Sequence, residues 1–538
     1  MVRGAVLMEL DRDQSLIKGC CIAGVLIVSL SVLLPWSFTL LRPGENLIAN
    51  PSVVDDSFYY FKTARYLART GDATFDGLNK TNGFHPLWML VNAAVWIALP
   101  DNVSSFAAWQ VFSLLKLGFL LLTYGICIWL FWRLLGPWPA VCAVSMLAYF
   151  RHTNLVIYGM ESTINIPLGL VMAVSFSGYL LKSHLPGAVL RSTSLGVLIG
   201  LWGLARLDNL LTFPWVLLIL FVGLLVAGQS RKRSFLMATG VLSIGTVVVL
   251  PYLLWNVVVH HHLMPISGMI KGSFYNPGIN LAYIRFYKDH FILLVGTAGI
   301  IGYGLCKAGG GGKITRSTAL TFGAATLLMG GVMTACYTVV FTKTSAGGWY
   351  FGTQCTAVLM ATALAAHWLK LPLQNRMGKR TFALICVLLP LLAGCQYLGY
   401  YFYRMKEMPN GTSAGFYQGA LWIKKHISEE AVLAGTDVGL IGYFSDRTVI
   451  NLDGLINSYE FYEYLKRHQR DEFLVKKKAD YLVGVGQCVG NLSRFTPPYE
   501  YSFPDTHIVT DEDEVWRSDI YLHDEGKPAM VTVWKFHK

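Results

Sequence analysis

The feature that most constrains this chain is a series of apolar runs, each about as long as a bilayer is thick. Roughly 20 helical residues cross a hydrocarbon layer of about 30 Å, and such runs recur from residue 19 to residue 403. Only 14% of the 538 residues are charged and the mean hydropathy is +0.46, whereas about a quarter of a soluble domain is charged. We therefore predict an all-α polytopic membrane bundle over most of the chain.

The apolar runs predict eleven membrane-spanning helices. They lie at 19–41, 106–132, 137–153, 162–181, 187–205, 209–228, 234–258, 290–306, 318–341, 352–369 and 381–403. The stretch 86–99 is also apolar but has only 14 residues. At that length an interfacial or re-entrant helix is favoured over a crossing.

Basic residues between the spans indicate the orientation of the chain. They fall in alternate short loops, as the positive-inside rule requires: Arg133, Lys182, Arg191, Arg231, Lys232, Arg233, Lys307, Lys313, Arg316, Lys370, Arg376, Lys379 and Arg380. Eleven crossings then place the N-terminus in the cytosol and the end of the chain outside the plasma (inner) membrane. The net charge of +12 follows from topology, and we expect membrane lipids but no nucleic acid as partners.

The chain divides into two domains. Residues 1–403 form the transmembrane domain, which includes a long first outer loop at 42–105. Residues 404–538 are polar and alternate between helix and strand signals, which predicts a small α/β domain outside the membrane. Its predicted elements are helices at 414–427, 439–444 and 458–478 and strands at 431–435, 448–452, 481–485 and 530–536.

Two adjacent carboxylates, Asp55 and Asp56, open a predicted amphipathic helix at 56–70. One interpretation is that they cap this helix and interact with its dipole. A second is that one of them is a general base, placed where an acceptor hydroxyl must lose a proton. A third is a divalent cation site, since paired aspartates suit Mg²⁺ or Mn²⁺. The sequence alone leaves all three open.

The basic side of the same helix carries Lys62, Arg65 and Arg69 at helical spacing. Such a helix can lie in the headgroup layer with this side toward phosphates. No other metal signal occurs, because the ten cysteines form no Cys-x-x-Cys pair and nine of them lie in or beside predicted spans. We predict neither a zinc site nor a disulfide framework.

Four further positions near the predicted outer ends of spans can each serve structure or substrate. Glu161 either caps the next span or faces a cavity. Arg206, beside Asp208, forms either a local ion pair or a bidentate phosphate contact. Lys271 is a candidate charge for an anionic donor. Tyr350 belongs to an aromatic pair that either anchors a span at the interface or stacks on a sugar ring.

The ordered set of these motifs resembles a known superfamily. Asp55-Asp56, Thr81-Asn82-Gly83-Phe84-His85-Pro86-Leu87-Trp88, Gly159-Met160-Glu161, Ala205-Arg206-Leu207-Asp208 and Asp437-x-Gly439-x-x-Gly442-Tyr443 occur in this order. Together they look like bacterial membrane glycosyltransferases of the GT-C superfamily, related to protein mannosyltransferases and aminoarabinose transferases. The resemblance runs from residue 20 to about residue 460.

The resemblance implies an inverting transfer of a sugar from a polyprenyl-phosphate donor to a glycan, lipid or protein acceptor. In that superfamily an aspartate of the first outer loop is the catalytic base, which corresponds here to Asp55 or Asp56. We expect substrate contacts from Arg65, His85, Glu161, Arg206, Asp208, Lys271 and Tyr350. The chain departs from the usual pattern at Leu207, where the superfamily has proline, and before the tenth span, where a second basic residue is often found.

Two other classes of function compete with the transferase. A flippase or transporter for a lipid-linked sugar would need acidic residues deep in the spans and repeated halves, and the predicted spans show almost no acids and no clear repeat. A non-catalytic cell-envelope assembly protein would use the α/β tail to bind a partner. That alternative leaves the loop aspartates unexplained.

Overall fold

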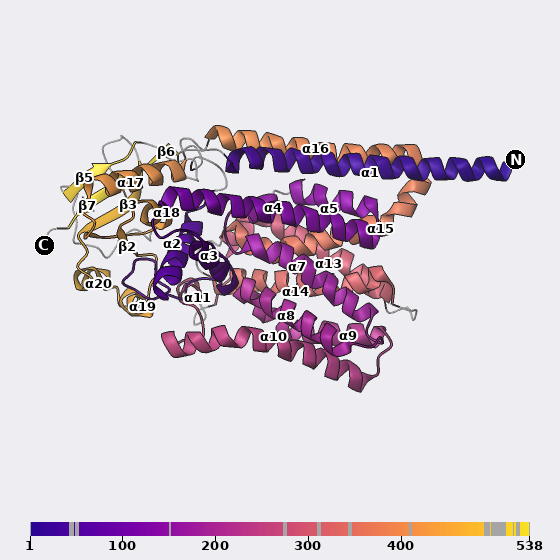
Figure 1. Ribbon diagram of the computed structural model, residues 1–538, viewed down its shortest axis with the longest axis horizontal. Helices are drawn as coiled ribbons and strands as arrows, with labels where there is room; N and C mark the ends of the chain where they lie inside the picture. The colour runs from indigo at the N-terminus through magenta and orange to yellow at the C-terminus, as the bar shows by residue number, and fades with distance from the viewer. Residues whose placement is uncertain are drawn as a thin grey trace.

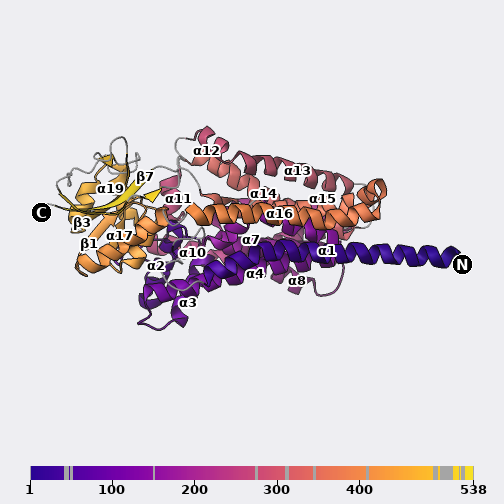
Figure 2. The same ribbon diagram turned by 90° about the horizontal axis from the view of Figure 1, so that it is seen from above.

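In the computed structural model, long helices run side by side along one axis, and a small α/β domain lies across one end of them (Figure 1). The view from above shows the same arrangement, with the N-terminus at the opposite end of the bundle (Figure 2). The structure describes residues 2–41, 48, 53–149, 152–272, 277–308, 314–342, 347–407, 411–488, 495–496, 513–519, 521–522 and 528–536.

Ten of the described helices are long and apolar enough to cross a membrane. Their apolar windows agree with ten of the eleven predicted spans, since span formation depends mainly on local hydrophobic content. These helices are α1 (Val2–Leu40), α4 (Ser105–Leu135), α7 (Ser162–Leu181), α8 (Ala188–Ala205), η2 with α9 (Leu207–Thr212 and Phe213–Val226), α10 (Arg231–His260), α13 (Lys288–Ala308), α14 (Arg316–Phe341), η3 with α15 (Gly348–Phe351 and Gly352–Met377) and α16 (Lys379–Glu407).

The predicted span at 137–153 is the exception. It forms α5 (Pro137–Tyr149), which has only 13 residues, followed by the short α6 (His152–Ile157). After α6 the chain is nevertheless back at the end of the bundle that lies next to the C-terminal domain, because Glu161 contacts Tyr60 of the first loop. Helix α5 packs against α1, α4, α15 and α16. A crossing made of short pieces is tolerated at such a place because it is enclosed by protein rather than lipid.

The first loop contributes two helices that lie between the bundle and the α/β domain (Figure 1). Helix α2 (Asp55–Thr70) confirms the predicted helix at 56–70 and ends where Gly71 adopts a φ of 79°. Helix α3 (Pro86–Ala98) has 13 residues, too few for a crossing. Its apolar residues Leu90 and Ile97 are 57% and 69% exposed, which suits a helix at a membrane surface.

The C-terminal domain is the predicted α/β unit. Strand β1 runs parallel to β2 and β3, and β7 runs antiparallel to β3 and β5. Along the main path the order is β2 (Thr448–Asn451), β1 (Val432–Gly435), β3 (Tyr481–Cys488), β7 (Pro528–Lys535) and β5 (Glu514–Arg517). The short strands β4 (Phe495–Thr496) and β6 (Tyr521–Leu522) pair with β3 and β7, and neither they nor β5 were predicted.

Four helices lie in the described part of this domain: α17 (Thr412–His426), α18 (Gly439–Phe444), α19 (Tyr459–Lys466) and α20 (Arg470–Lys476). The single helix predicted at 458–478 is wrong in one respect, because it forms two helices. The break coincides with His468, whose φ of 56° lies in the left-handed region. A helix cannot continue through that backbone conformation.

One hydrophobic core joins the first loop, the start of α4 and the C-terminal domain. Phe58 of α2 lies 4.9 Å from Trp109 and 5.3 Å from Tyr443, measured between ring centroids. Phe61 stacks on Phe112 at 4.3 Å. Each aromatic pair contributes roughly 0.5–1.5 kcal/mol beyond burial of its area. The C-terminal domain is therefore packed onto α2 as part of one core.

Candidate active site

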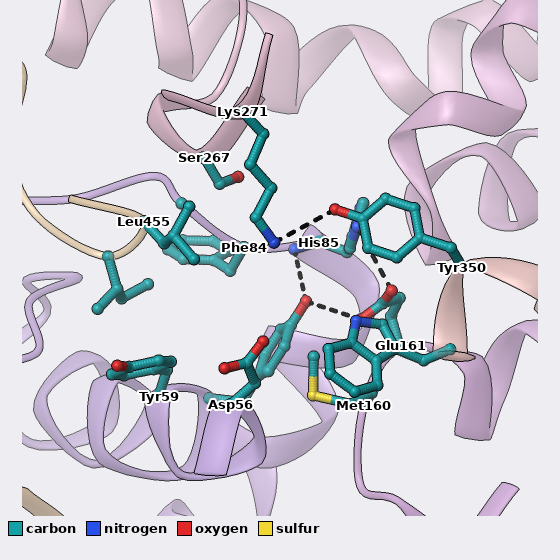
Figure 3. A pocket seen from close by; sticks show the side chains of 14 residues that line it. Asp56, Tyr59, Phe84, His85, Met160, Glu161, Ser267, Lys271, Tyr350 and Leu455 are labelled. Atoms are coloured by element: carbon teal, nitrogen blue, oxygen red, sulfur yellow. Dashed lines mark hydrogen bonds and ion pairs between the residues drawn. The ribbon is translucent and has the colours of Figure 1, made fainter. Parts of the chain in front are cut away.

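A pocket with an empty volume of about 520 Å³ opens where α2, the bundle and the C-terminal domain meet (Figure 3). Six separate segments of the chain supply its walls. The lining residues are Asp56, Tyr59, Tyr60, Gly83, Phe84, His85, Met160, Glu161, Ser267, Lys271, Trp349, Tyr350, Leu455 and Ile456. Five of the nine predicted site residues lie on this surface.

The structure separates the roles of the two adjacent aspartates. The carboxylate of Asp55 points away from the pocket and accepts hydrogen bonds from the backbone N–H groups of Gly439 (3.0 Å) and Leu440 (2.7 Å) at the start of α18. Asp56 lines the pocket, and its carboxylate accepts no hydrogen bond from any described residue. Neighbouring residues of a helix point about 100° apart, so one of them caps α18 while the other faces the cavity.

Burial raises the pKa of both aspartates. The pKa of Asp56 rises to about 6, because burial disfavours its charged form, with Lys271 opposing the shift and Asp453 and Glu161 adding to it. Burial and the nearby Asp437 raise the pKa of Asp55 well above its usual range. The pKa direction does not distinguish the two, whereas the geometry does. Only Asp56 combines access to the pocket with a pKa suited to accepting a proton near neutral pH.

Lys271, the last residue of the short helix α11 (Ile266–Lys271), brings the opposite charge to the pocket. Its ammonium and the carboxyl group of Asp56 point toward the same space (Figure 3). Lys271 donates a hydrogen bond to the hydroxyl of Tyr350 at 3.4 Å, and no described carboxylate lies within ion-pairing distance. Despite burial, the contact with Tyr350 and the negative charge of Asp56 raise the pKa of Lys271. Lys271 is a fixed cation available to an anionic ligand.

The side chain of Asn82 holds this lysine segment in place. Asn82 is fully buried, and its carbonyl oxygen accepts from the backbone N–H of Ile266 at 2.9 Å. Its amide group donates to Asn256 near the end of α10 at 3.1 Å. In the sequence, Asn82 was recognised only as part of the motif at 81–88, with no role of its own, so this positioning role was missed.

Arg206 forms the local ion pair, which is one of the two alternatives that the sequence left open. Its guanidinium is 1% exposed and binds both oxygens of Asp208 at 2.8 and 2.9 Å. It also donates to Glu161 at 2.6 Å and to the backbone carbonyl of Trp349 at 3.1 Å, and it lies 4.6 Å above the ring of Tyr350. Arg206 thereby holds Glu161 and Tyr350 on the pocket wall, with little donor capacity left for phosphate.

We expect Arg206→Met to lower the free energy of unfolding by about 3–5 kcal/mol, because it leaves two buried carboxylates without their cation. The measurement is the melting temperature of the purified protein in detergent. Arg69→Met is a matched control, since Arg69 pairs with the exposed Asp101 and an exposed pair contributes about 0–1 kcal/mol. Equal melting temperatures for the two variants would show that the buried ion pairs do not stabilise the fold.

His85 connects the first loop to the same network. Its Nδ1 accepts a hydrogen bond from the backbone N–H of Leu207 at 3.0 Å, so the neutral ring carries its proton on Nε2, 3.7 Å from the Glu161 carboxylate. Burial lowers the pKa of His85, against the opposing charge of Glu161. Tyr60 donates to Glu161 at 3.3 Å and accepts from the His85 backbone N–H at 3.2 Å. The carboxylate of Glu161 is therefore buried and held by Arg206 and Tyr60, with His85 beside it.

Arg65 lies outside the pocket, which corrects the expectation of a substrate contact there. It is nine residues after Asp56, and at about 100° per residue this places it on the opposite side of α2. It pairs with Asp446 of the C-terminal domain at 3.1 Å. Lys62 donates to the backbone carbonyl of Arg447 at 2.8 Å, and Arg69 pairs with Asp101. The basic side of α2 therefore faces protein rather than lipid phosphates.

The ligand atoms at the paired aspartates do not fit a divalent cation. Both oxygens of Asp55 accept backbone N–H groups, and Asp56 shares its surroundings with the cationic Lys271. Across the described ranges, no group of three or more His, Cys, Asp or Glu side chains could hold a metal ion. A Mg²⁺ site needs several oxygen ligands arranged octahedrally, and Asp56 alone supplies one carboxylate.

The C-terminal domain supplies site residues that sequence reasoning missed. Leu455 and Ile456 line the pocket, and Asp453 accepts a hydrogen bond from Tyr59 at 3.2 Å. The loop that carries them comes nearly 400 positions after α2 in the sequence. It has no composition or motif that marks it as part of a site, so only its packing on α2 reveals its place.

Parts of this chain are similar to a protein family and to solved structures. Residues 406–524 match a family described as "Domain of unknown function (DUF8728)". No curated protein sequence matches the chain. Among solved structures, ArnT from Cupriavidus metallidurans bound to undecaprenyl phosphate superposes with a TM-score of 0.57. The two share 14% sequence identity, with 94% of this chain and 97% of that chain covered.

An archaeal oligosaccharyltransferase is also similar. AglB from Archaeoglobus fulgidus, in complex with an inhibitory peptide and a dolichol-phosphate, superposes with a TM-score of 0.52 at 12% identity, covering 86% of this chain and 69% of that chain. The same protein in complex with Zn and sulfate also gives 0.52, at 13% identity, covering 86% and 67%. ArnT and AglB are GT-C superfamily members. Together with the helical bundle and its α/β domain, these similarities show that the chain has the GT-C fold.

Proposed function

We propose that this protein is a membrane glycosyltransferase that moves a sugar from a polyprenyl-phosphate donor to a hydroxyl of a glycan, lipid or protein acceptor. The observation that carries the proposal is that one pocket contains both Asp56, whose carboxylate accepts no hydrogen bond from a described residue, and Lys271, which forms no ion pair with a described carboxylate. The solved structures of ArnT and AglB, which hold undecaprenyl phosphate and a dolichol-phosphate, support a lipid-linked donor.

Asp56 is the general base of the proposed reaction. Its carboxylate takes the proton of the acceptor hydroxyl as that oxygen attacks the anomeric carbon of the sugar. The bond between the anomeric carbon and the phosphate oxygen breaks, and the polyprenyl phosphate leaves with the electron pair. Attack opposite the leaving group inverts the anomeric configuration. Lys271 stabilises the negative charge that develops on the departing phosphate.

The charges of the pocket remain balanced through this step. Before transfer, the pocket contains the anionic Asp56, the cationic Lys271 and a donor phosphodiester with one negative charge. After transfer, Asp56 is protonated and the phosphate has gained up to one further negative charge. The total charge is thus about the same in both states. A cation that faces both groups serves reactant and product without rearrangement of the site.

Other residues at or beside the pocket hold its side chains in place and orient the donor sugar. Arg206 keeps Glu161 in place, and Glu161 in turn receives Tyr60 and faces His85. Trp349 and Tyr350 present aromatic surface beside Lys271. Aromatic faces suit the apolar faces of sugar rings, so we assign donor-sugar stacking to this pair. No divalent cation takes part in the proposed step.

The distribution of charge supports an extracytoplasmic site. Basic residues of the short loops lie at helix ends opposite the pocket, for example Arg133 at the end of α4 and Arg316 at the start of α14. Lys313 lies outside the described residues. By the positive-inside rule, the basic end faces the cytosol together with the N-terminus. The pocket and the C-terminal domain then face the outer side of the inner membrane, where a lipid-linked donor needs no nucleotide.

The pH dependence of transfer tests this assignment. Because Asp56 acts as a base only when ionised, and its pKa is raised to about 6, activity should be low at pH 5 and rise to a plateau above pH 7. The measurement is the initial rate of radiolabelled sugar transfer from a polyprenyl-phosphate donor by membranes that contain the protein, from pH 4.5 to 8. Membranes without the protein are the control. Absence of transfer from every donor, or a rate that falls over this range, would contradict the proposal.

A further inference from the structure

The C-terminal domain contacts α2 from Asp55 to Arg65. Asp55 caps α18, and Tyr59, one helical turn later, reaches the loops after β1 and β2. Lys62 and Arg65 then bind Arg447 and Asp446. These four α2 residues follow one another at a spacing of three or four positions, so they form one side of the helix. Asp56 and Tyr60 occupy the neighbouring side, which faces the pocket.

The hydroxyl of Tyr59 is the central contact. It donates to the carboxylate of Asp453 at 3.2 Å and accepts from the side chain of Asn451 at 2.9 Å and the backbone N–H of Val438 at 3.1 Å. A phenol has one donor and two acceptor sites, so this hydroxyl is saturated by the C-terminal domain. The ring of Tyr59 also lines the pocket, one turn from Asp56.

The loop that carries Asp453 is itself well fixed. The Asp453 carboxylate also accepts from the backbone N–H of Leu455 at 3.0 Å. The backbone N–H of Gly454, whose φ is 82°, donates to the side chain of Asn451 at 2.9 Å. Leu455 and Ile456 follow directly and form part of the pocket wall. The same loop therefore anchors α2 and closes the cavity that α2 faces.

We propose that the C-terminal domain is a working part of the active site, and that Asp453 is the positioning residue through which it acts on Asp56. This inference rests on the proposed function, because it takes Asp56 as the base. It also assigns a role to the region that matches a domain of unknown function. The domain holds α2, which carries Asp56, beside the pocket and supplies part of the pocket wall.

The charges around Asp56 indicate the direction of the effect. Lys271 lowers its pKa, whereas Asp453 and Glu161 raise it, and Asp55 precedes it on α2. Glu161 is already paired with Arg206, while the described partners of Asp453 are a tyrosine hydroxyl and backbone N–H groups. Removing the negative charge of Asp453 should therefore lower the pKa of Asp56. Loss of packing alone would not move this titration in a fixed direction.

The experiment is a pH titration of the Asp56 carboxyl group in the purified full-length protein in lipid nanodiscs. Infrared difference spectra between each protein and the same protein carrying Asp56→Asn identify the band of the protonated group. We expect a midpoint near pH 6 for the wild type. In Asp453→Asn the midpoint should fall by about half a pH unit or more, and Asp453→Glu should restore it.

Asp446→Asn is the matched control, because it removes the same charge from the same domain at the far side of α2, where Asp446 pairs with Arg65 and Lys424. It should leave the midpoint unchanged. A midpoint that does not move in Asp453→Asn, or that moves equally in both variants, overturns the inference. Asp453→Ser replaces Asp453→Asn if the melting temperature shows that the latter is unfolded.

This titration needs no substrate, so its outcome is independent of any transfer assay. A wild type that transfers no sugar overturns the proposed function and leaves the coupling between Asp453 and Asp56 standing. A wild type that transfers sugar with no effect of Asp453 on the midpoint overturns the inference and leaves the proposed function standing. The two failures are therefore distinguishable.

Discussion

Asp56→Asn should lower the rate of sugar transfer by about 10²- to 10⁴-fold, the usual contribution of a general base. The amide has the shape of the carboxylate but cannot take the acceptor proton. The loss should appear in the rate at saturating donor, because Asp56 carries the same sign of charge as the donor phosphate and does not bind it. The measurement is transfer by purified protein at pH 7.5, with equal amounts of each variant.

Asp55→Asn is the matched control, since it changes the adjacent residue by the same atoms. Its side-chain oxygen can still accept from one of the two N–H groups of Gly439 and Leu440, and asparagine is a good helix cap. The rate should fall by less than about tenfold, in line with the loss of a single hydrogen bond. If Asp55→Asn shows the larger loss, the two aspartates have been assigned in reverse.

Lys271→Met should lower transfer by about 10²- to 10³-fold, as expected when one stabilising group is removed from a developing anion. Methionine keeps much of the length and apolar volume of the side chain but removes the charge. The variant should also bind undecaprenyl phosphate more weakly, which can be measured directly by titration in nanodiscs. A fall in both quantities would locate the phosphate beside Lys271.

Two controls make this result specific. Lys80→Met removes an exposed lysine that pairs with Asp72 at the surface, and it should change neither quantity. Lys271→Arg keeps the charge with a different shape and should recover part of the phosphate affinity. If Lys271→Met binds undecaprenyl phosphate as tightly as the wild type, the phosphate lies elsewhere and the proposed mechanism loses its cation.

Part of the site could be predicted because its residues act through local signals. Asp56, His85, Glu161, Lys271 and Tyr350 belong to motifs or interfaces at the ends of spans, and the pocket collects all five. Arg206 and Asp208 were also recognised as a pair, but the sequence could not show that Glu161 completes it. Because the guanidinium of Arg206 is buried and occupied by two carboxylates, removing it is destabilising and few of its donors remain for a ligand.

Arg65 was predicted to contact substrate but lies outside the pocket, for a physical reason that the sequence does not contain. A basic side of an amphipathic helix suits lipid phosphates and suits the acidic groups of another domain equally well. The presence of Asp446 at that side is decided by the packing of a domain that begins more than 300 residues later. The same packing decides that Asp55 caps α18 while Asp56 faces the pocket.

The sequence by itself determined the membrane bundle, its basic end and the alternating elements of the tail, because hydrophobic length, charge and periodicity are local properties that each segment carries with it. Only the tertiary structure decided which aspartate faces the pocket, how the short pieces α5 and α6 complete the bundle, and that Leu455 and Ile456 line the pocket while Asp453 binds Tyr59. These features arise from contacts between segments far apart in the chain. Such contacts depend on how complementary surfaces meet, which no single segment specifies.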